Sequence, residues 1–301
     1  MNVLVLDIGG SSIKIAVMNE QREIIERGKR ETPLSDMDAL FDCFKEIYEG
    51  YGKGVGGIAI SMPGVIDSEH GYAYTAGALR YLKNRAFAKE VSQLFHCPVW
   101  IGNDAKCAGI AEVGYGALQG VEDAIVIILG TGIGGCLIKD GKVHQGKHFC
   151  SGEVSSLHLD YKITRGDKAN WWRINGIQGL LETAQKHLQS DMPMSGEEIF
   201  ALAHAGNERA LAAIHEFSDR IALQLFNIQA IYDAEKIAIG GGISAQDLLI
   251  ECIQESFEQI CVDEPVVMPQ IIACQFRNDA NLIGAYYQFI IENISLLNKY
   301  F

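Results

Sequence analysis

Two glycine-rich turns, each set between two apolar strands, carry the residue types best suited to bind phosphate. The first lies in VLVLDIGGSSIKIAV, residues 3–17, and the second in AIVIILGTGIGGCLI, residues 124–138. Glycine has no Cβ and tolerates positive φ, so successive backbone N–H groups can close around phosphate oxygens. The residues of this candidate phosphate site are Gly9, Gly10, Ser11, Ser12, Lys14, Gly130, Thr131 and Gly132.

Asp7 ends the first apolar strand, directly before the first glycine turn. A carboxylate in this place can hold a phosphate-bound Mg²⁺ through the water shell of the ion. Lys14 follows on the next strand, where it could touch phosphate or equally remain a solvated side chain of an alternating strand.

The second turn has two alternative interpretations. Gly130-Thr131-Gly132-Ile133-Gly134-Gly135 also satisfies the G-x-G-x-x-G pattern of dinucleotide-binding folds. That turn must open a helix, whereas the following CLIKDGKV alternates like a strand and contains the hairpin dipeptide Asp140-Gly141. The pattern therefore favours a strand, turn, strand unit, and a hairpin with a purely structural role is the other alternative.

Composition excludes several partners. The 301 residues include 38 acidic and 25 basic ones, for a net charge of −13 that opposes binding to nucleic acid. The first residues lack the basic and apolar segments of a signal peptide, and no apolar run reaches membrane-spanning length. We therefore expect a cytoplasmic protein without membrane contacts. Its eight cysteines contain no CxxC pair, so we expect no disulfides.

Between and after the turns, helical and strand patterns alternate, which is typical of an α/β protein. A glycine-containing stretch at 114–120 is the expected boundary between two lobes. The predicted helices are 36–49, 87–95, 103–113, 210–231, one beginning near 245, and 279–294, and the further predicted strands are 55–61, 99–101 and 236–239.

With these pieces in this order, the chain resembles the ROK family of sugar kinases and repressors, in the actin-like and hexokinase-like ATPase superfamily. The motifs that carry the resemblance are DIGGSSIK (7–14), SMPGVID (61–67), NDAKCAGIAE (103–112), GTGIGG (130–135), SGEV (151–154), IGGGIS (239–244) and NDANLIGA (278–285). The resemblance implies a two-lobed, ribonuclease H-like α/β fold of duplicated βββαβα units. ATP and a sugar would meet in the cleft between the lobes, with Mg²⁺ as cofactor.

The implied lobes are residues 1–117, with a C-terminal helix at about 285–301 packing back on them, and residues 118–284. In the family's pattern Thr131 and Gly132 face the γ-phosphate, while Gly241 and Gly242 approach the adenosine. A homodimer is common in this family and is expected here.

Asp104 is the candidate catalytic base. The resemblance implies that it accepts the proton of the attacking sugar hydroxyl while Asn103 binds a neighbouring hydroxyl. The alternative is that this Asn-Asp pair only caps the following helix, as these residue types often do.

Glu153 and Glu182 are the candidate carboxylates for sugar hydroxyls, because one carboxylate can accept two hydrogen bonds. Glu153 matches the sugar-contacting glutamate of the family. Glu182 ends RINGIQGLLE, residues 173–182, which keeps the glycines of the family's zinc segment C-x-C-G-x-x-G-C-x-E but none of its cysteines. A solvated helix residue is the alternative for Glu182.

The family's zinc histidine is replaced by Ser156, so we expect the structural zinc to be absent. A substitute site built from His144, His148, Cys150 and His158 is the alternative. Such a site needs all four side chains to converge as a tetrahedron.

The loop around Gly64 and Gly77, together with Ser156, is expected to shape the sugar site. Small residues at 76–78, the lost zinc ligands and the NDANLIGAYYQF ending resemble the β-glucoside kinase branch, which phosphorylates the 6-hydroxyl of the non-reducing glucose of cellobiose and related β-glucosides. The alternatives are a glucokinase, a fructokinase, an N-acylhexosamine kinase, or a catalytically silent sugar sensor. A DNA-binding repressor is disfavoured, because the phosphate turn begins at Asp7 and leaves no preceding helix-turn-helix.

Overall fold

The computed structural model describes residues 1–159, 169–190 and 192–297 and divides into two compact units. The N-terminal unit comprises Met1–Gly114, Gln145–Cys150 and the chain from Asp279 onward. The C-terminal unit comprises Tyr115–His144 and Ser151–Asn278. The first segment of the N-terminal unit therefore ends at Gly114, and its last segment begins at Asp279. The sequence-based prediction placed these two boundaries at residues 117 and 285. Residues 298–301 of the predicted C-terminal helix lie outside the described chain.

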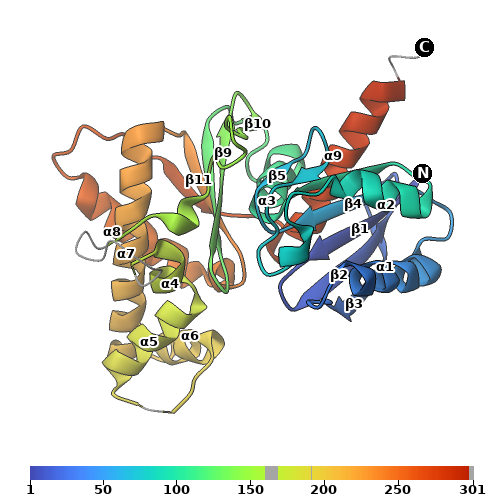
Figure 1. The fold of residues 1–301 in the computed structure, drawn as a ribbon. Coiled ribbons are helices and arrows are strands. Elements are labelled where there is room, and N and C mark those ends of the chain that lie inside the picture. Colours follow the sequence, from blue (N-terminus) through green and yellow to red (C-terminus); the bar gives the residue numbers. More distant parts are fainter. Residues whose placement is uncertain (160–168, 191, 298–301) are drawn as a thin grey trace. The chain divides into compact units, whose positions relative to one another are not determined.

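The N-terminal unit is built on a five-stranded sheet in the order β3-β2-β1-β4-β7 (Figure 1). β1, β2 and β3 pair antiparallel, whereas β4 pairs parallel with both β1 and β7. The strands are β1 (Asn2–Ile8), β2 (Ser12–Met18), β3 (Ile24–Glu31), β4 (Val55–Met62) and β7 (Val99–Asn103). A short hairpin of β5 (Ile66–Asp67) and β6 (Tyr72–Ala73) follows β4.

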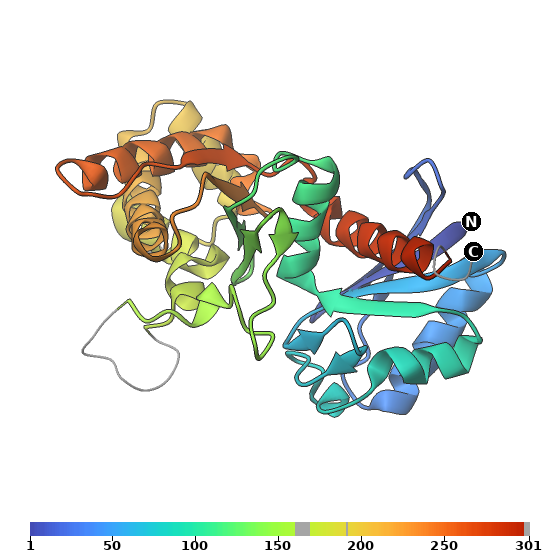
Figure 2. The same ribbon diagram turned by 90° about the horizontal axis from the view of Figure 1, so that it is seen from above.

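Helices cover both faces of this sheet. Alternate strand residues such as Leu4 and Leu6 form one core with Phe44 of α1 (Met37–Tyr51) and Phe87 of α2 (Phe87–Phe95). α9 (Ala280–Leu297) packs on β1, β4 and β7, on the side of the sheet away from α1 and α2 (Figure 2). α3 (Asp104–Tyr115) follows β7 directly.

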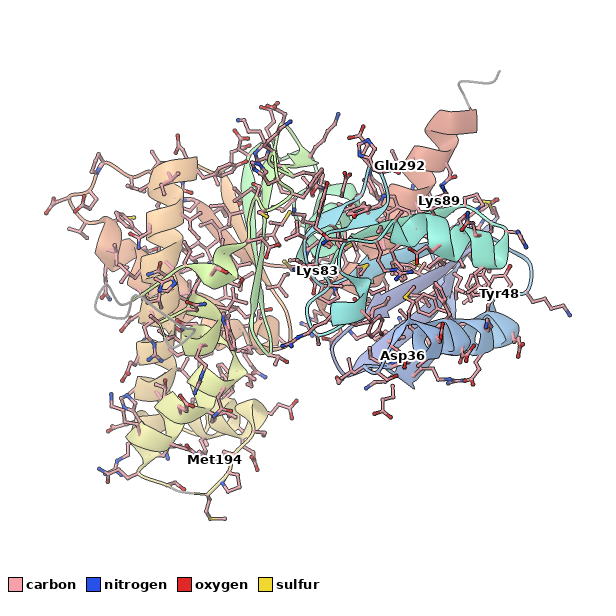
Figure 3. All side chains as sticks on the ribbon, viewed as in Figure 1. Asp36, Tyr48, Lys83, Lys89, Met194 and Glu292 are labelled. Carbon is pink, nitrogen blue, oxygen red and sulfur yellow. The ribbon has the colours of Figure 1, made fainter. Side chains whose placement is uncertain are left out.

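α1 begins where the sequence predicts. Asp36, labelled in Figure 3, is its N-cap, and its Oδ1 accepts a hydrogen bond of 2.9 Å from the Ala39 N–H. This bond satisfies one of the four N–H groups that the first turn of a helix leaves without a partner.

The C-terminal unit repeats the same sheet. Its order is β10-β9-β8-β11-β12, again three antiparallel strands followed by two parallel ones. The strands are β8 (Ala124–Leu129), β9 (Ile133–Lys139), β10 (Lys142–Val143), β11 (Lys236–Gly240) and β12 (Gln270–Ala273). The prediction of a duplicated α/β fold is therefore confirmed.

The turn after β8 leads into a strand rather than a helix. β9 and β10 form the predicted hairpin, with positive φ at both turn residues, 52° at Asp140 and 69° at Gly141. This geometry suits the right-handed twist of the flanking strands. It removes the dinucleotide interpretation of Gly130–Gly135, because no helix begins there.

A helical layer packs on the second sheet. Its helices are α4 (Trp171–Asn175), α5 (Ile177–Leu188), α6 (Gly196–His204), α7 (Glu208–Tyr232) and α8 (Asp247–Cys261). Trp171 is fully buried in their core, as expected of a packing residue. The periodicity predicted α7 well, whereas α4, α5 and α6 were not predicted, because their apolar residues are fewer and their segments shorter.

Two further elements differ from the sequence-based prediction for local reasons. The 3-10 turn η3 (Ile243–Ala245) delays α8, so the helix begins at Asp247 rather than near Ala245. β3 was missed because most of its side chains are exposed and polar at the sheet edge. The remaining 3-10 turns are η1 (Arg80–Leu82), η2 (Val154–Ser156) and η4 (Arg277–Asp279).

None of the described helices is both long enough and apolar enough to cross a membrane. No disulfide links the cysteines of the described chain.

Candidate active site

The chemistry-bearing residues of the N-terminal unit gather at one edge of its sheet. Asp7, Ser61 and Asn103 lie at or near the carboxyl ends of the parallel strands β1, β4 and β7. Asp7 is paired in register with Ser61, and Met62 with Asn103. Ligands of open α/β sheets bind outside this edge, where strands end and polar loops begin.

The Asp7 carboxylate is held by partners from three elements. Its Oδ1 accepts hydrogen bonds from Ser61 Oγ at 2.9 Å and from Asn281 Nδ2 at 3.1 Å. Lys14 Nζ lies 3.4 Å from Oδ2. Asp7 is only 6% exposed, and these contacts fix the orientation of its carboxylate, whose two oxygens can each accept more than one hydrogen bond.

Neither Ser61 nor Asn281 was assigned a role from the sequence. The sequence could have indicated a role for both residues, because they lie within the quoted motifs SMPGVID and NDANLIGA. The neighbouring Asp279 forms a two-bond ion pair with Arg27 of β3, at 2.8 and 2.9 Å. The start of α9 is thereby attached to the sheet beside Asp7.

Asn103 and Asp104 stand at the junction of β7 and α3. Asn103 is 4% exposed; its Oδ1 accepts from the Lys106 N–H at 3.0 Å, and its Nδ2 donates to the Gly64 carbonyl at 3.0 Å. Asn103 therefore does cap the helix, and the same bond network fixes the Gly64 loop. Asp104 is half-buried, and its Oδ1 accepts from the Ala105 N–H at 2.8 Å.

The structure brings Gly64 and Gly77 together through the loop between β4 and α2. Gly64 has φ +107°, and a Cβ there would collide with the Thr75 carbonyl. Gly77 has φ +58°, and a Cβ there would lie 3.2 Å from the Pro63 ring. Both glycines are required by the backbone, and the resulting loop is tied to Asn103.

In the C-terminal unit, the turns after β8 and β11 open onto one cavity of about 450 Å³. β8 and β11 are parallel neighbours, so their carboxyl ends lie at the same sheet edge. Gly130, Thr131 and Gly242 line this cavity, together with Ile177, Leu180, Ser195, Gly196, Glu197, Phe200, Ile243 and Gln246. Gly132 and Gly241 are not among its lining residues.

The α6 wall of this cavity was missed from the sequence. Ser195 caps α6 through a capping box with Glu198, and Glu197 and Phe200 face the cavity from the first turns of the helix. The S-x-x-E pattern of Ser195-Gly196-Glu197-Glu198 could have revealed the helix start, but nothing in it indicates a cavity.

The glycines of the two phosphate turns serve close approach rather than positive φ. Neither Gly10 nor Gly130 has a positive φ, and a Cβ on either would meet no described protein atom within 4 Å. Gly241, in contrast, has φ +92°, and a Cβ there would collide with Leu129. The expected left-handed backbone is therefore not found at Gly10 or Gly130. The positive φ of Gly241 was not predicted from the sequence.

In the first turn, the Gly9 N–H donates to the Ser12 carbonyl at 2.9 Å, and Thr32 Oγ1 donates to the Gly9 carbonyl at 2.7 Å. Ser11 and Gly10 are exposed at its tip. The turn is therefore tied down at its base and accessible at its tip.

Glu153 precedes the 3-10 turn η2, and Ser156 is the last residue of this turn. Gly152, at φ +82°, lies so close to β9 that a Cβ would come within 2.9 Å of the Cys136 Cα. Residues three apart eclipse each other in a 3-10 turn, so the exposed Glu153 and Ser156 share one side of η2.

Glu182 is exposed on α5 and is held by a cation. Its Oε1 accepts from Arg173 Nη2 at 2.8 Å and from Gln178 Nε2 at 3.2 Å. The Arg173 guanidinium lowers the pKa of Glu182, so the carboxylate is ionised at neutral pH. This ion pair connects the two ends of the segment 173–182.

Asn175, in the same segment, is fully buried and donates to the Phe217 carbonyl at 3.0 Å. Among the described residues, no group of three or more His, Cys, Asp or Glu side chains could hold a metal ion. That holds for the four candidates His144, His148, Cys150 and His158, all of which are described.

Residues 3–291 match the ROK family, which spans nearly the whole chain and both units described above. The chain belongs to the ROK family. The resemblance drawn from its motifs is therefore confirmed, and so is the actin-like and hexokinase-like fold class.

Relatives in the family include sugar kinases. A β-glucoside kinase of Listeria monocytogenes is 28% identical over 296 residues, which cover 97% of this chain and 98% of that protein. An N-acetyl-D-glucosamine kinase of Haemophilus influenzae is 29% identical over 268 residues, covering 83% of this chain and 87% of that protein. The crystal structure of a ROK family protein from Streptococcus pneumoniae TIGR4, in complex with sucrose, has a TM-score of 0.85 at 28% identity and covers 98% of this chain and 100% of that one.

Proposed function

We propose that this ROK family chain is an ATP-dependent sugar kinase. It transfers the γ-phosphoryl group of ATP to the 6-hydroxyl of a glucosyl unit, in a β-glucoside such as cellobiose. The observation that carries the proposal is the set of polar side chains at the carboxyl edge of the first sheet, centred on Asp7 and Asn103, together with the glycine-lined cavity at the matching edge of the second sheet.

The cavity of the C-terminal unit suits the adenosine and phosphates of ATP. Gly242 lets the backbone approach the nucleoside, and Gly130 and Thr131 offer N–H and hydroxyl donors to phosphate oxygens. Phe200 supplies an apolar wall for the base, and Glu197 can accept hydrogen bonds from ribose hydroxyls. Gly132 and Gly241, which do not line this cavity, would contribute by shaping the backbone of the two turns.

Asp7 fits a magnesium role. It is a buried carboxylate, oriented by two neutral donors on Oδ1, with Oδ2 shared with Lys14. Mg²⁺ prefers one or two carboxylates and keeps most of its water, and when bound with ATP it neutralises charge on the phosphate oxygens. Lys14, Ser11 and Ser12 would contribute further donors beside Gly9 and Gly10.

In the proposed reaction Asp104 accepts the proton of the sugar hydroxyl as the hydroxyl oxygen attacks the γ-phosphorus. The bond from that phosphorus to the β,γ-bridging oxygen breaks, and ADP leaves. Because the transition state is loose, positioning contributes more than covalent chemistry. Asn103, already fixed by the Gly64 loop, would keep its second N–H hydrogen for a sugar hydroxyl.

Glu153 and Glu182 are proposed to accept hydrogen bonds from other sugar hydroxyls. Glu182 Oε2 has only a 3.4 Å contact with Arg173 Nη1, so acceptor capacity remains beside the ion pair. Ser156 in place of an imidazole, and the small residues around Gly77, leave room for an aglycone. The similar β-glucoside kinase of Listeria monocytogenes supports this substrate class, whereas the similar N-acetyl-D-glucosamine kinase supports the alternative of a monosaccharide kinase.

A coupled ADP-release assay with cellobiose, glucose and N-acetylglucosamine tests the proposal. We expect turnover that requires both sugar and Mg²⁺ and is fastest with cellobiose. A strong preference for a monosaccharide would replace the β-glucoside assignment, and the absence of turnover with every sugar, despite sugar binding, would favour the silent sensor.

A further inference from the structure

A second cavity of the C-terminal unit lies apart from the glycine turns. It has a volume of about 600 Å³ and is lined by residues of α4, α5 and α7, among them Arg173, Glu182, Thr183, Lys186, Glu216 and Arg220. We call it the α5–α7 cleft. α5 lines both cavities with different residues: Ile177 and Leu180 face the glycine-lined cavity, whereas Gly179 and Thr183 face the cleft.

The carboxylates of the cleft are outnumbered by its cations. Arg173 is matched by Glu182 at 2.8 Å. Glu216 faces Lys186 at 3.3 Å, Arg220 at 3.6 Å and the adjacent His187 at 2.7 Å, and Asp219 also acts electrostatically on Arg220. The residues that line the cleft thus include three permanent cations and two carboxylates, in a chain whose net charge is −13.

Arg220 is the least well satisfied of these cations. Its Nη2 donates to Thr183 Oγ1, and its distance of 3.6 Å from Glu216 is too long for a good hydrogen bond. Its Nε is buried and has no hydrogen-bond partner among the described residues. A buried donor left without a partner is costly, and burial lowers the pKa of this guanidinium.

We propose that the α5–α7 cleft binds a small phosphate-bearing anion through Arg220 and Lys186. Arginine presents a planar set of donors that matches phosphate oxygens, and lysine supplies a point charge. Thr183 positions the Arg220 guanidinium, because its hydroxyl donates to the Gly179 carbonyl at 2.7 Å and accepts from Arg220 Nη2. A dianion would reverse the local excess of positive charge. The volume exceeds what inorganic phosphate alone fills and lies in the range of small-molecule sites.

The ligand is either inorganic phosphate or a sugar phosphate, and binding measurements separate the two. The full-length protein is first saturated with Mg-ADP, so that the glycine turns are filled. Inorganic phosphate and glucose 6-phosphate are then titrated separately by calorimetry, with glucose as the uncharged comparison. Binding of inorganic phosphate assigns the cleft to the free anion, and binding of glucose 6-phosphate alone assigns it to a sugar phosphate.

Variants decide whether the bound anion occupies the cleft. Arg220→Gln and Lys186→Gln should each weaken binding by about tenfold, the loss expected for one charge-assisted hydrogen bond. Lys186 is mostly exposed, so its variant tests the site even if Arg220→Gln fails to fold. Arg209→Gln, on the same helix α7 but outside the cleft, should leave the affinity unchanged.

Two results would overturn the proposal. One is that neither anion binds saturably. The other is that binding is the same in Lys186→Gln as in the unaltered protein, which would place the anion elsewhere, for example in the sugar site as a product. Because binding rather than turnover is measured, the outcome does not depend on whether the chain is a kinase.

Discussion

Asp104 is the residue on which the proposed reaction depends most directly. Asp104 begins α3, and its carboxylate accepts a hydrogen bond from the adjacent Ala105 N–H. Asp104→Asn keeps the shape and this acceptor but removes the proton acceptor. We expect phosphorylation to fall by at least about a hundredfold, the usual contribution of a general base, with sugar affinity retained.

Asp38→Asn is the control, because Asp38 is likewise an aspartate in the first turn of a helix of the N-terminal unit, although it is exposed whereas Asp104 is half-buried. Steady-state rates and calorimetric sugar binding are compared for the two variants. Near-normal turnover in Asp104→Asn would show that Asp104 is not the catalytic base and serves only the start of helix α3.

Asn281 tests the Asp7 arrangement. Asn281→Ala removes the 3.1 Å hydrogen bond to Asp7 Oδ1, so the carboxylate is held by Ser61 and Lys14 alone. We expect the KM for Mg-ATP to rise by about tenfold, with a smaller change in the KM for sugar. Asn293→Ala, which removes a bond to the Phe289 carbonyl on the same helix, is the control. Equal effects on both KM values would indicate a general loss of structure at the start of α9.

The loop after β4 is an element whose shape depends on one glycine. Gly64→Ala places a side chain at φ +107° and against the Thr75 carbonyl, and the same loop accepts the Asn103 hydrogen bond. We expect a loss of more than about 2 kcal/mol in unfolding free energy, since strain and collision add, and a raised KM for sugar. Gly54→Ala, at φ +79° with no described atom within 4 Å of a Cβ, should cost only the strain. Urea unfolding of both variants measures the difference, and equal losses would contradict the collision.

The Asp279–Arg27 ion pair, which attaches the start of α9 to β3, predicts that the free energy of unfolding depends on pH. The Arg27 guanidinium lowers the pKa of Asp279 below its ordinary value of 3.8. A carboxylate whose pKa is lowered in the folded state stabilises the fold at pH values above its unfolded-state pKa. This contribution is lost as the pH falls through the lower folded-state pKa. The pair is partly exposed, so it contributes about 1 kcal/mol or less.

Arg27→Gln should therefore be slightly less stable than the unaltered protein at neutral pH. The difference should shrink below the ordinary carboxyl pKa and vanish below the lower folded-state pKa of Asp279. Arg30→Gln on the same strand, whose described side-chain bond goes to the Lys29 carbonyl, provides the control. Urea midpoints across this pH range measure the effect. A difference that persists at the lowest pH would show that Arg27 acts through packing rather than charge.

For the molecule as a whole, the sequence predicted the repeated strand, turn, strand units, because apolar strands and glycine turns are local signals. It also predicted α2 with its bounds and the hairpin at Asp140-Gly141. It did not predict β3, whose polar residues hide an edge strand, nor α4, α5 and α6, which are held by tertiary packing of Trp171 and its neighbours.

The candidate site was predicted only where a motif carried it. Asp7, Asn103 and the glycine turns belong to such motifs. Ser61 of β4 and Asn281 of α9 also lie in quoted motifs, but their contacts with Asp7 were not predicted, and neither was the cavity wall that Glu197 and Phe200 of α6 provide. These residues are brought together by the fold over long sequence separations, and single-sequence patterns do not report such contacts. The residue types of the segment 173–182 could be read from the sequence, but the ion pair between Arg173 and Glu182 could not.

The most direct test of the central claim is ADP release by the purified protein with Mg-ATP, measured with and without cellobiose and repeated with Asp104→Asn. The account predicts ADP release that depends on cellobiose, yields a phosphorylated disaccharide, exceeds the rate on glucose, and is lost in the variant. ADP release that is independent of any sugar, or unchanged in Asp104→Asn, would contradict it.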